Sequence, residues 1–491
     1  MDRRISGFVE MHQLAKLDLR YVWHPFTQMQ DWLKRDPIVI MEGRGALLRD
    51  VHGREYLDAN SSIWTNLHGH NHPKINSGIQ RQLKKIAHSS PLGLANEPAS
   101  LLAAELIEST RPRITHPSSV ALLAKGDHAS PAEALSKVFF SDDGSTAMEV
   151  ALKLAYEYTR RSGRSNRPKF LSLEGAYHGD TVGAVALGHI DLFHKAYSGL
   201  LFKTDKAQAP YCYRCPYNRA KPERADAREY RKCNWECVDK LEQKFERQKK
   251  KGNRYAAFVV EPLIQGAAGL IPQPAGWLKR AAEISRGHGA LLIADEVMTG
   301  FGRTGNAPTL FACQQEGVQP DLMAVAKGLT AGYLPMAATL TTQRIFDAFL
   351  GEYHEFKTFF HGHSYTGNQL GAAAALANLE ILQSSASIRA RRSLQATLQQ
   401  ELKSLSTLPN VGDIRQVGLV AGIELVKVWR TREPFDLRER AGIRVCEAMA
   451  KRGVLTRPIG NVVVLMPPYC TTREQVKQMV SALKEAVSEL F

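Results

Sequence analysis

Short apolar segments alternate with helical segments through the middle of the chain. Three apolar segments have the length of a strand, and each ends in a carboxylate or a glycine: residues 169–175 (KFLSLEG), 256–262 (AAFVVEP) and 290–297 (ALLIADEV). Strands that alternate with helices predict a parallel sheet. Ligands gather at the carboxyl ends of such strands, so the residues that follow them are the first candidates for a functional site.

The length of the chain predicts more than one domain. Its 491 residues are too many for one simple core and favour one large domain with a smaller one. We expect an N-terminal segment over 1–74, a large domain over 75–345 with an insert at 211–240, and a C-terminal domain over 346–491. The predicted fold class is α/β, with a mainly parallel sheet flanked by helices and a smaller α+β domain built from both termini.

Charge and apolar content exclude several classes of protein. The formal net charge is +15, but the basic residues are spread along the chain, so we expect no nucleic-acid partner. Residues 1–17 contain charges and no apolar core, which argues against a secretory signal. No window approaches the roughly 18 apolar residues that a membrane span needs. Seven cysteines without such a signal predict a cytoplasmic protein.

Two ionisable residues follow buried strands. Asp295 ends the apolar run ALLIAD, where a carboxylate is costly unless it has a partner. A protonated pyridine nitrogen would be such a partner, although a helix cap or a salt bridge explains the position as well. Lys327 follows the apolar run LMAVA and precedes Gly328. Its amine either extends to solvent or is partly desolvated and nucleophilic toward an aldehyde, as pyridoxal phosphate (PLP) requires.

Two loops add features that suit a phosphorylated aromatic cofactor. Gly144 and Ser145, in SDDGSTAMEVA, lie between a strand and a helix, where backbone N–H groups and hydroxyls can bind a phosphate. A plain helix N-cap explains the same residues equally well. Tyr177, in GAYHGDT, offers a flat ring for stacking on a cofactor, whereas residue statistics favour a structural role for the adjacent His178.

Taken together, six motifs resemble a known family. They are SDDGSTAMEVALK, YHGDT, EPLIQG, DEVMTGFGRTG, KGLTAGYLP and HGHSYTGNQ. In this order they resemble the class III aminotransferases of PLP fold type I, from about residue 20 to the end. Within the family, the segments 23–29, 61–73 and 455–469 resemble members that aminate 8-amino-7-oxononanoate (KAPA) in biotin synthesis. The resemblance implies a PLP-dependent transaminase, a homodimer, that takes KAPA and an amino donor as small-molecule substrates.

The resemblance also implies a role for each matching residue. Lys327 would carry PLP as a Schiff base and then act as the base, while Asp295 would hold the pyridinium. Tyr177 and Val297 would flank the ring, and Arg457 would pair with the KAPA carboxylate. The other implied cofactor-binding residues are Gly144, Ser145, His178, Glu261 and, from the neighbouring subunit, Ser364. The other implied substrate-binding residues are Phe26, Trp64 and Gly362.

The amino donor is predicted from departures from the family pattern. Members that use S-adenosylmethionine carry a tyrosine at the position of Phe26, two tryptophans at Ile63 and Trp64, and HGPTF at 361–365, where this chain has HGHSY. The groups that hold adenosylmethionine are therefore partly absent. The pattern resembles members that use L-lysine, and we expect L-lysine to be favoured. Another class III ω-aminotransferase, acting on a diamine or ω-amino acid, is the alternative.

The insert contains two cysteine pairs, C-x2-C and C-x3-C. They are Cys212, Cys215, Cys233 and Cys237. This spacing suits zinc, and a metal could staple a segment that has little core of its own. Four reduced thiols explain the pattern as well, so no metal is assigned. A metal-binding regulatory module is the competing class of protein, but it would have no need of Lys327 and Asp295 together.

Overall fold

The structure is a computed structural model in which residues 11–111 and 133–491 are described. Residues 1–10, which carry part of the segment considered for a secretory signal, lie outside the described residues. Among the described helices, none is both long and apolar enough to cross a bilayer.

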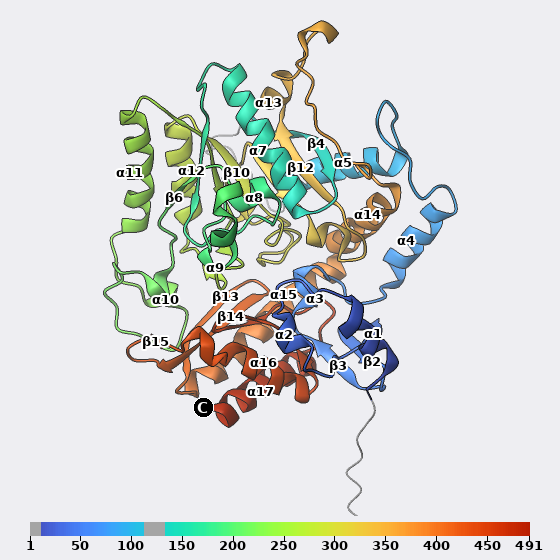
Figure 1. The fold of residues 1–491 in the computed structure, drawn as a ribbon, viewed down its shortest axis with the longest axis vertical. Helices are drawn as coiled ribbons and strands as arrows, with labels where there is room; N and C mark the ends of the chain where they lie inside the picture. Colours follow the sequence, from blue (N-terminus) through green and yellow to red (C-terminus); the bar gives the residue numbers. More distant parts are fainter. Residues whose placement is uncertain (1–10, 112–132) are drawn as a thin grey trace, which may run out of the picture.

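A seven-stranded sheet lies at the centre of the upper part of the molecule (Figure 1). Its strand order is β4-β12-β11-β10-β7-β5-β6. Strand β12 is antiparallel to both of its neighbours, whereas the other neighbouring strands pair in parallel. The strands are β4 (Leu135–Ser141), β5 (Lys169–Leu173), β6 (Asp205–Ala207), β7 (Tyr255–Val260), β10 (Leu291–Asp295), β11 (Leu322–Val325) and β12 (Ala337–Thr342). The predicted, mainly parallel α/β sheet is therefore confirmed.

Helices cover both faces of this sheet, which explains why its strands are apolar throughout. Alternate residues of a strand point to opposite faces. In β10, Leu291 and Ile293 join the hydrophobic cluster that contains α7 (Gly144–Arg161), whereas Leu292 joins the cluster that contains α12 (Trp277–Gly287). Every residue of β10 is buried.

The remaining helices surround the sheets. In the N-terminal half they are α1 (Gln13–Tyr21), α2 (Met29–Trp32), α3 (Ser61–Trp64), α4 (Pro73–Leu83), α5 (Glu97–Thr110), α8 (Val182–Ala186), α9 (Asp191–His194), α10 (Ala227–Tyr230) and α11 (Glu236–Lys250). In the C-terminal half they are α13 (Gln343–Asp347), α14 (Gln369–Gln383), α15 (Ser385–Leu402), α16 (Ala441–Lys451) and α17 (Arg473–Leu490).

Strands from both ends of the chain form the smaller α+β part. A four-stranded sheet joins β1 (Ile40–Arg44), β2 (Leu47–Asp50) and β3 (Glu55–Asp58) to β16 (Val454–Leu455). A five-stranded sheet contains β13 (Val411–Val417), β14 (Val420–Val428), β15 (Glu433–Pro434), β17 (Pro458–Ile459) and β18 (Val462–Leu465). The predicted α+β part from both termini is confirmed, while the boundaries after residues 74 and 345 stay predictions.

The sequence pattern missed β6 and β12. Strand β6 has three residues, two of them charged, at the edge of the sheet. Strand β12 contains three threonines and follows the glycine-rich turn at 328–332, so its sequence is less apolar than that of its neighbours. Both strands are defined by their pairing in the sheet rather than by their own composition.

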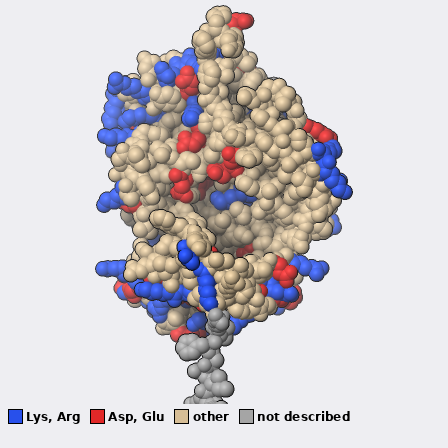
Figure 2. Space-filling view, turned by 45° about the vertical axis from the view of Figure 1, so that its right-hand side comes forward, with Lys and Arg blue, Asp and Glu red and all other residues tan. Residues whose placement is uncertain are grey.

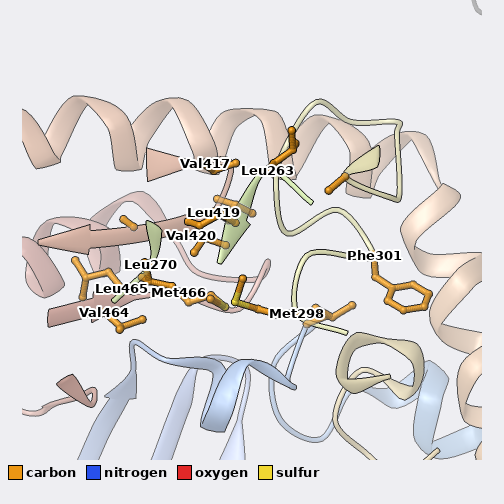
Figure 3. Packing of buried hydrophobic residues seen from close by; sticks show 14 of the residues in the cluster. Leu263, Leu270, Met298, Phe301, Val417, Leu419, Val420, Val464, Leu465 and Met466 are labelled. Carbon is orange, nitrogen blue, oxygen red and sulfur yellow. The ribbon is translucent and has the colours of Figure 1, made fainter. Parts of the chain in front are cut away.

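A shared hydrophobic core joins the segments that follow β7 and β10 to the C-terminal sheet (Figure 3). Leu263, Leu270 and Met298 come from these segments and belong to the same buried cluster as Val420 and Leu465. Because the segments at the carboxyl ends of two parallel strands pack against the C-terminal sheet, their side chains are held in place between the two parts.

Candidate active site

A cavity of about 370 Å³ lies at the carboxyl ends of the parallel strands. The face shown in Figure 2 is hollowed between the upper and lower parts of the molecule, with charged side chains around the hollow. Among the residues lining the cavity are nine that the sequence had indicated. They are Trp64, Gly144, Ser145, Tyr177, His178, Glu261, Asp295, Val297 and Lys327. Residues far apart in the sequence therefore meet at one edge of the sheet, where α/β folds place their ligands.

Lys327 lies directly beyond the end of β11 in a strained backbone conformation. Its φ is 41°, which is uncommon for a residue with a side chain and is typical of functional sites. Burial lowers the pKa of its amine, while the charges of Asp295 and Glu261 act in the opposite direction. The Nζ atom lies 5.5 Å from the centre of the Trp64 ring. The lowered pKa makes the neutral, nucleophilic form of the amine easier to reach.

Asp295 is buried at the end of β10 and forms a pair with His178. The His178 Nδ1 atom lies 2.7 Å from Asp295 Oδ2, and the Val297 backbone N–H donates to Asp295 Oδ1 at 3.1 Å. Burial alone would lower the pKa of His178, but the hydrogen bond and the charge of Asp295 raise it above its usual value. The other ring nitrogen, Nε2, is buried without a hydrogen-bond partner among the described residues. The carboxylate is therefore oriented by two donors.

Glu261 is a second buried carboxyl group in the cavity wall. Its oxygens accept hydrogen bonds from the backbone N–H groups of Gly266, at 2.7 Å, and Tyr177, at 3.4 Å. Burial raises the pKa of Glu261 to about 7. A proton can therefore be held or released at this carboxyl group near neutral pH.

The loop before α7 has the shape that an anion site requires. Asp143 is the N-cap of α7 and accepts from the Thr146 backbone N–H at 2.9 Å. Ser145 does not cap the helix, and its hydroxyl accepts from the Asp180 backbone N–H at 3.1 Å. A Cβ atom on Gly144 would lie 2.7 Å from Val297 Cγ1, so this position has no room for a side chain. The first turn of an 18-residue helix thus faces the cavity, and helix N-termini favour anions.

An aromatic row leads from the surface to the cavity wall. The ring of Phe26 lies 5.4 Å from that of Phe193, which lies 6.3 Å from that of Tyr177. The Tyr177 hydroxyl donates to Asp180 at 2.7 Å, which fixes its ring. Phe193 was missed in the sequence, because one aromatic residue in a short polar helix gives no signal of a site. Tyr333, which does line the cavity, was also missed, although it follows Lys327 closely in the chain.

Four predicted site residues do not line the cavity of the single chain. Phe26 is 63% exposed and reaches the cavity only through Phe193. Gly362 and Ser364 lie on an exposed loop, where the Ser364 carbonyl accepts a hydrogen bond from His88 Nε2 at 2.8 Å. Arg457 is exposed between β16 and β17. Their assigned roles therefore stay predictions.

Comparison with known proteins identifies the family. Residues 29–487 match the aminotransferase class-III family. The chain belongs to that family. A class-III relative from Geobacter sulfurreducens, an adenosylmethionine-8-amino-7-oxononanoate aminotransferase, is 46% identical over 474 residues, which cover 96% of this chain and 97% of the relative.

Solved structures of class-III proteins show the same fold. The crystal structure of the adenosylmethionine-8-amino-7-oxononanoate aminotransferase from Methanocaldococcus jannaschii matches with a TM-score of 0.85 at 39% identity, covering 97% of this chain and 98% of that one. A PLP-bound amine transaminase from an uncultivated Pseudomonas species matches with a TM-score of 0.82 at 33% identity, covering 96% and 99%. The protein therefore has the PLP fold type I and is a PLP-dependent aminotransferase.

The cavity of this class-III aminotransferase fits the cofactor. The amine of Lys327 and the carboxylate of Asp295 line the same space as the N-terminal turn of α7. Gly144 lets Val297 pack directly against the first turn of α7, and His178 Nε2 is a buried polar atom without a hydrogen-bond partner among the described residues. Lys327 suits the aldehyde of the cofactor, Asp295 suits its pyridine nitrogen, and the first turn of α7 suits its phosphate.

Proposed function

We propose that the protein transaminates KAPA to 7,8-diaminononanoate in biotin synthesis. The observation that carries the proposal is the 46% identity, over 96% of the chain, to the Geobacter relative named for this acceptor. The amine transaminases and ω-transaminases among the solved structures share less of the sequence, at 26–33% identity. An ω-aminotransferase acting on another substrate is therefore the second candidate, and the assay below separates the two.

The roles of the cavity residues are proposed from their positions. PLP, when bound, supplies an electron sink that stabilises negative charge at the carbon next to the substrate nitrogen. Lys327 Nζ holds and moves the proton at that carbon. Asp295 keeps a proton on the ring nitrogen, Tyr177 and Val297 orient the ring, and the first turn of α7 at Gly144 binds the phosphate.

The remaining proposed groups surround these residues. His178 fixes Asp295 through their hydrogen bond, and Glu261 exchanges a proton beside the ring. Ser145 adds its hydroxyl to the phosphate site. Trp64, whose ring lies near the Lys327 amine, excludes water from the reacting atoms.

For the amino donor we propose S-adenosylmethionine. The relatives from Geobacter and Methanocaldococcus both carry adenosylmethionine in their names. The comparisons give no support to L-lysine, which the substitutions at Phe26 and Ile63 had led us to expect. The row from Phe26 through Phe193 to Tyr177 supplies aromatic faces that suit adenine and a sulfonium cation.

A direct assay tests acceptor and donor together. Purified protein is mixed with PLP, KAPA and either S-adenosylmethionine or L-lysine at equal concentrations, and diaminononanoate is measured by mass spectrometry. We expect diaminononanoate to form clearly faster with S-adenosylmethionine than with L-lysine. A faster rate with L-lysine would overturn the proposed donor and leave the proposed acceptor, KAPA, in place. If neither donor gives product, although the same protein transaminates a diamine, KAPA is not the acceptor.

Arg457→Ala is expected to lower the affinity for KAPA by about ten- to a hundredfold, because a charge-assisted hydrogen bond contributes about 1.5–3 kcal/mol. Arg457 is exposed in the chain without substrate, so the proposed pair forms only when KAPA covers it. The KM for KAPA should rise, whereas the half-reaction with the donor should keep its rate. Arg473→Ala, at the start of α17, is the matched control. An unchanged KM for KAPA in Arg457→Ala would remove this residue from the acceptor site.

A homodimer is the proposed active unit. Large apolar side chains are exposed on two segments of the chain, namely Leu92, Leu94, Tyr353, Phe360 and Tyr365. Such exposure marks an interface, and Ser364 lies within the second segment. We expect light scattering to give twice the chain mass, and dilution below the dimer dissociation constant to reduce specific activity. A fully active monomer would contradict the contribution of Ser364 to a neighbouring site.

A further inference from the structure

The insert leaves the large sheet after β6 and returns at α11 with almost no core of its own. Its buried cluster consists of Cys212, Tyr213 and Ala227. Polar contacts tie it to the C-terminal sheet instead, because Tyr211 donates to Glu424 at 2.6 Å and the Ala227 backbone N–H donates to Asp413 at 3.1 Å. A segment with so little buried apolar surface needs another source of stability.

The four cysteines of the insert meet around one small cavity of about 10 Å³. Cys212 and Cys215 lie at the two ends of a single 3₁₀ turn, while Cys233 and Cys237 flank the start of α11. The cavity has about the volume that one water molecule or one ion occupies.

Hydrogen bonds hold the two cysteine pairs together. The Asn218 side chain donates to the Cys212 carbonyl at 2.9 Å and accepts from the Lys232 backbone N–H at 2.9 Å. The Arg219 backbone N–H donates to the Lys232 carbonyl at 2.9 Å. The turn that holds Cys212 and Cys215 is therefore fixed beside Lys232, the residue before Cys233.

Two N–H donors are directed at the sulfur atoms. Arg231 donates to Cys233 Sγ at 3.1 Å, and Gln208 donates to Cys215 Sγ at 3.7 Å. Donors of this kind stabilise thiolates, whereas neutral thiols are weak acceptors.

We propose that Cys212, Cys215, Cys233 and Cys237 bind one zinc ion as four thiolates and that this ion staples the insert. Four sulfur ligands in two short pairs favour zinc among the common divalent ions. Binding replaces the S–H bonds by Zn–S bonds and releases the protons to solvent, with no change of oxidation state.

The four sulfur atoms must move toward the ion when it binds. Within residues 11–111 and 133–491, no group of three or more His, Cys, Asp or Glu side chains is already set to hold a metal ion. A Cys side chain moves its sulfur by rotation about one bond, so closure around a Zn–S distance of about 2.3 Å leaves the backbone turn in place. The stapled insert then holds Tyr211 and Ala227 against the C-terminal sheet.

The first test measures metal in the full-length, PLP-loaded protein purified under reducing conditions. Elemental analysis is expected to find one zinc per chain. Cobalt added to chelator-treated protein should give the intense red-wavelength bands of a tetrahedral thiolate site, where PLP does not absorb. Wild-type protein that contains no zinc above background and gives no cobalt bands would overturn the proposal.

Variants locate the site. Cys212→Ser and Cys237→Ser should lose zinc and lower the thermal midpoint, whereas Cys470→Ser, in the loop after β18, should keep both. Equal zinc in all three variants would overturn the assignment of the ligands. If the first two variants fail to fold, the cobalt titration of the wild-type protein still decides. Two disulfides within the insert, found by mass spectrometry in active protein that was purified under reducing conditions, would also overturn it.

Discussion

Lys327→Ala is expected to abolish transamination in protein that still folds. The substitution removes both the amine that binds the cofactor and the group that moves the proton. A positioned general base alone contributes about 10²–10⁴-fold, and loss of the covalent link adds to this. Turnover measured with KAPA and the better donor should therefore fall to background. Lys451→Ala, an exposed lysine on α16, is the matched control and should keep wild-type activity.

Chemical labelling gives an independent check on the same residue. Borohydride reduction of the PLP-loaded protein, followed by peptide mapping, should place the label on Lys327. The lowered pKa of this amine, caused by burial, makes it the expected site of reaction. Label on another lysine, or substantial activity in Lys327→Ala, would refute the central assignment.

Asp295→Asn is expected to lower kcat by about 10²–10³-fold, the range seen when one electrostatic group at a reacting centre is lost. The amide keeps the shape of the carboxylate but carries no charge to hold a proton on the ring nitrogen. It also removes the charge that raises the pKa of His178, so this pKa should fall. Single-turnover rates and the NMR titration of His178 would measure the two effects.

A second buried aspartate provides the control. Asp321 lies at the opposite end of the same sheet, where its carboxylate accepts from the Leu292 backbone N–H at 2.8 Å and pairs with Arg344 at 2.7 Å. Asp321→Asn should cost stability but leave kcat nearly unchanged. Equal losses of kcat in both variants would mean that Asp295 acts through folding rather than through the cofactor.

Residues at the ends of apolar strands were predictable from the sequence. A buried strand that ends in Asp295 or precedes Lys327 combines two conflicting requirements, burial and charge, and such conflicts concentrate at functional sites. The alternation of strands and helices predicted the parallel sheet, and the six motifs added the family. The resemblance indicated Glu261, and the loop after a predicted strand indicated Tyr177; the structure brings both to the same cavity.

Features that depend on contacts distant in sequence were not predictable. The cap of α7 is Asp143 rather than Ser145, and the Ser145 hydroxyl instead accepts a hydrogen bond from the backbone N–H of Asp180. The position of Phe193 between Phe26 and Tyr177 follows from the path of three separate segments. Strand β12 depends on pairing with β4 and β11. None of these contacts leaves a periodic signal in one stretch of chain.

The cavity walls come mainly from loops that follow separate strands. Substrate preference can therefore change during evolution while the fold stays the same. A substitution at Tyr333 changes the shape of the cavity wall at a position that lies outside the strands of the sheet. Selection can therefore exchange one amine for another by small steps, each leaving an expressible protein. A directed-evolution library restricted to these loops should yield mostly folded variants, whereas the same number of changes within β10 should yield few.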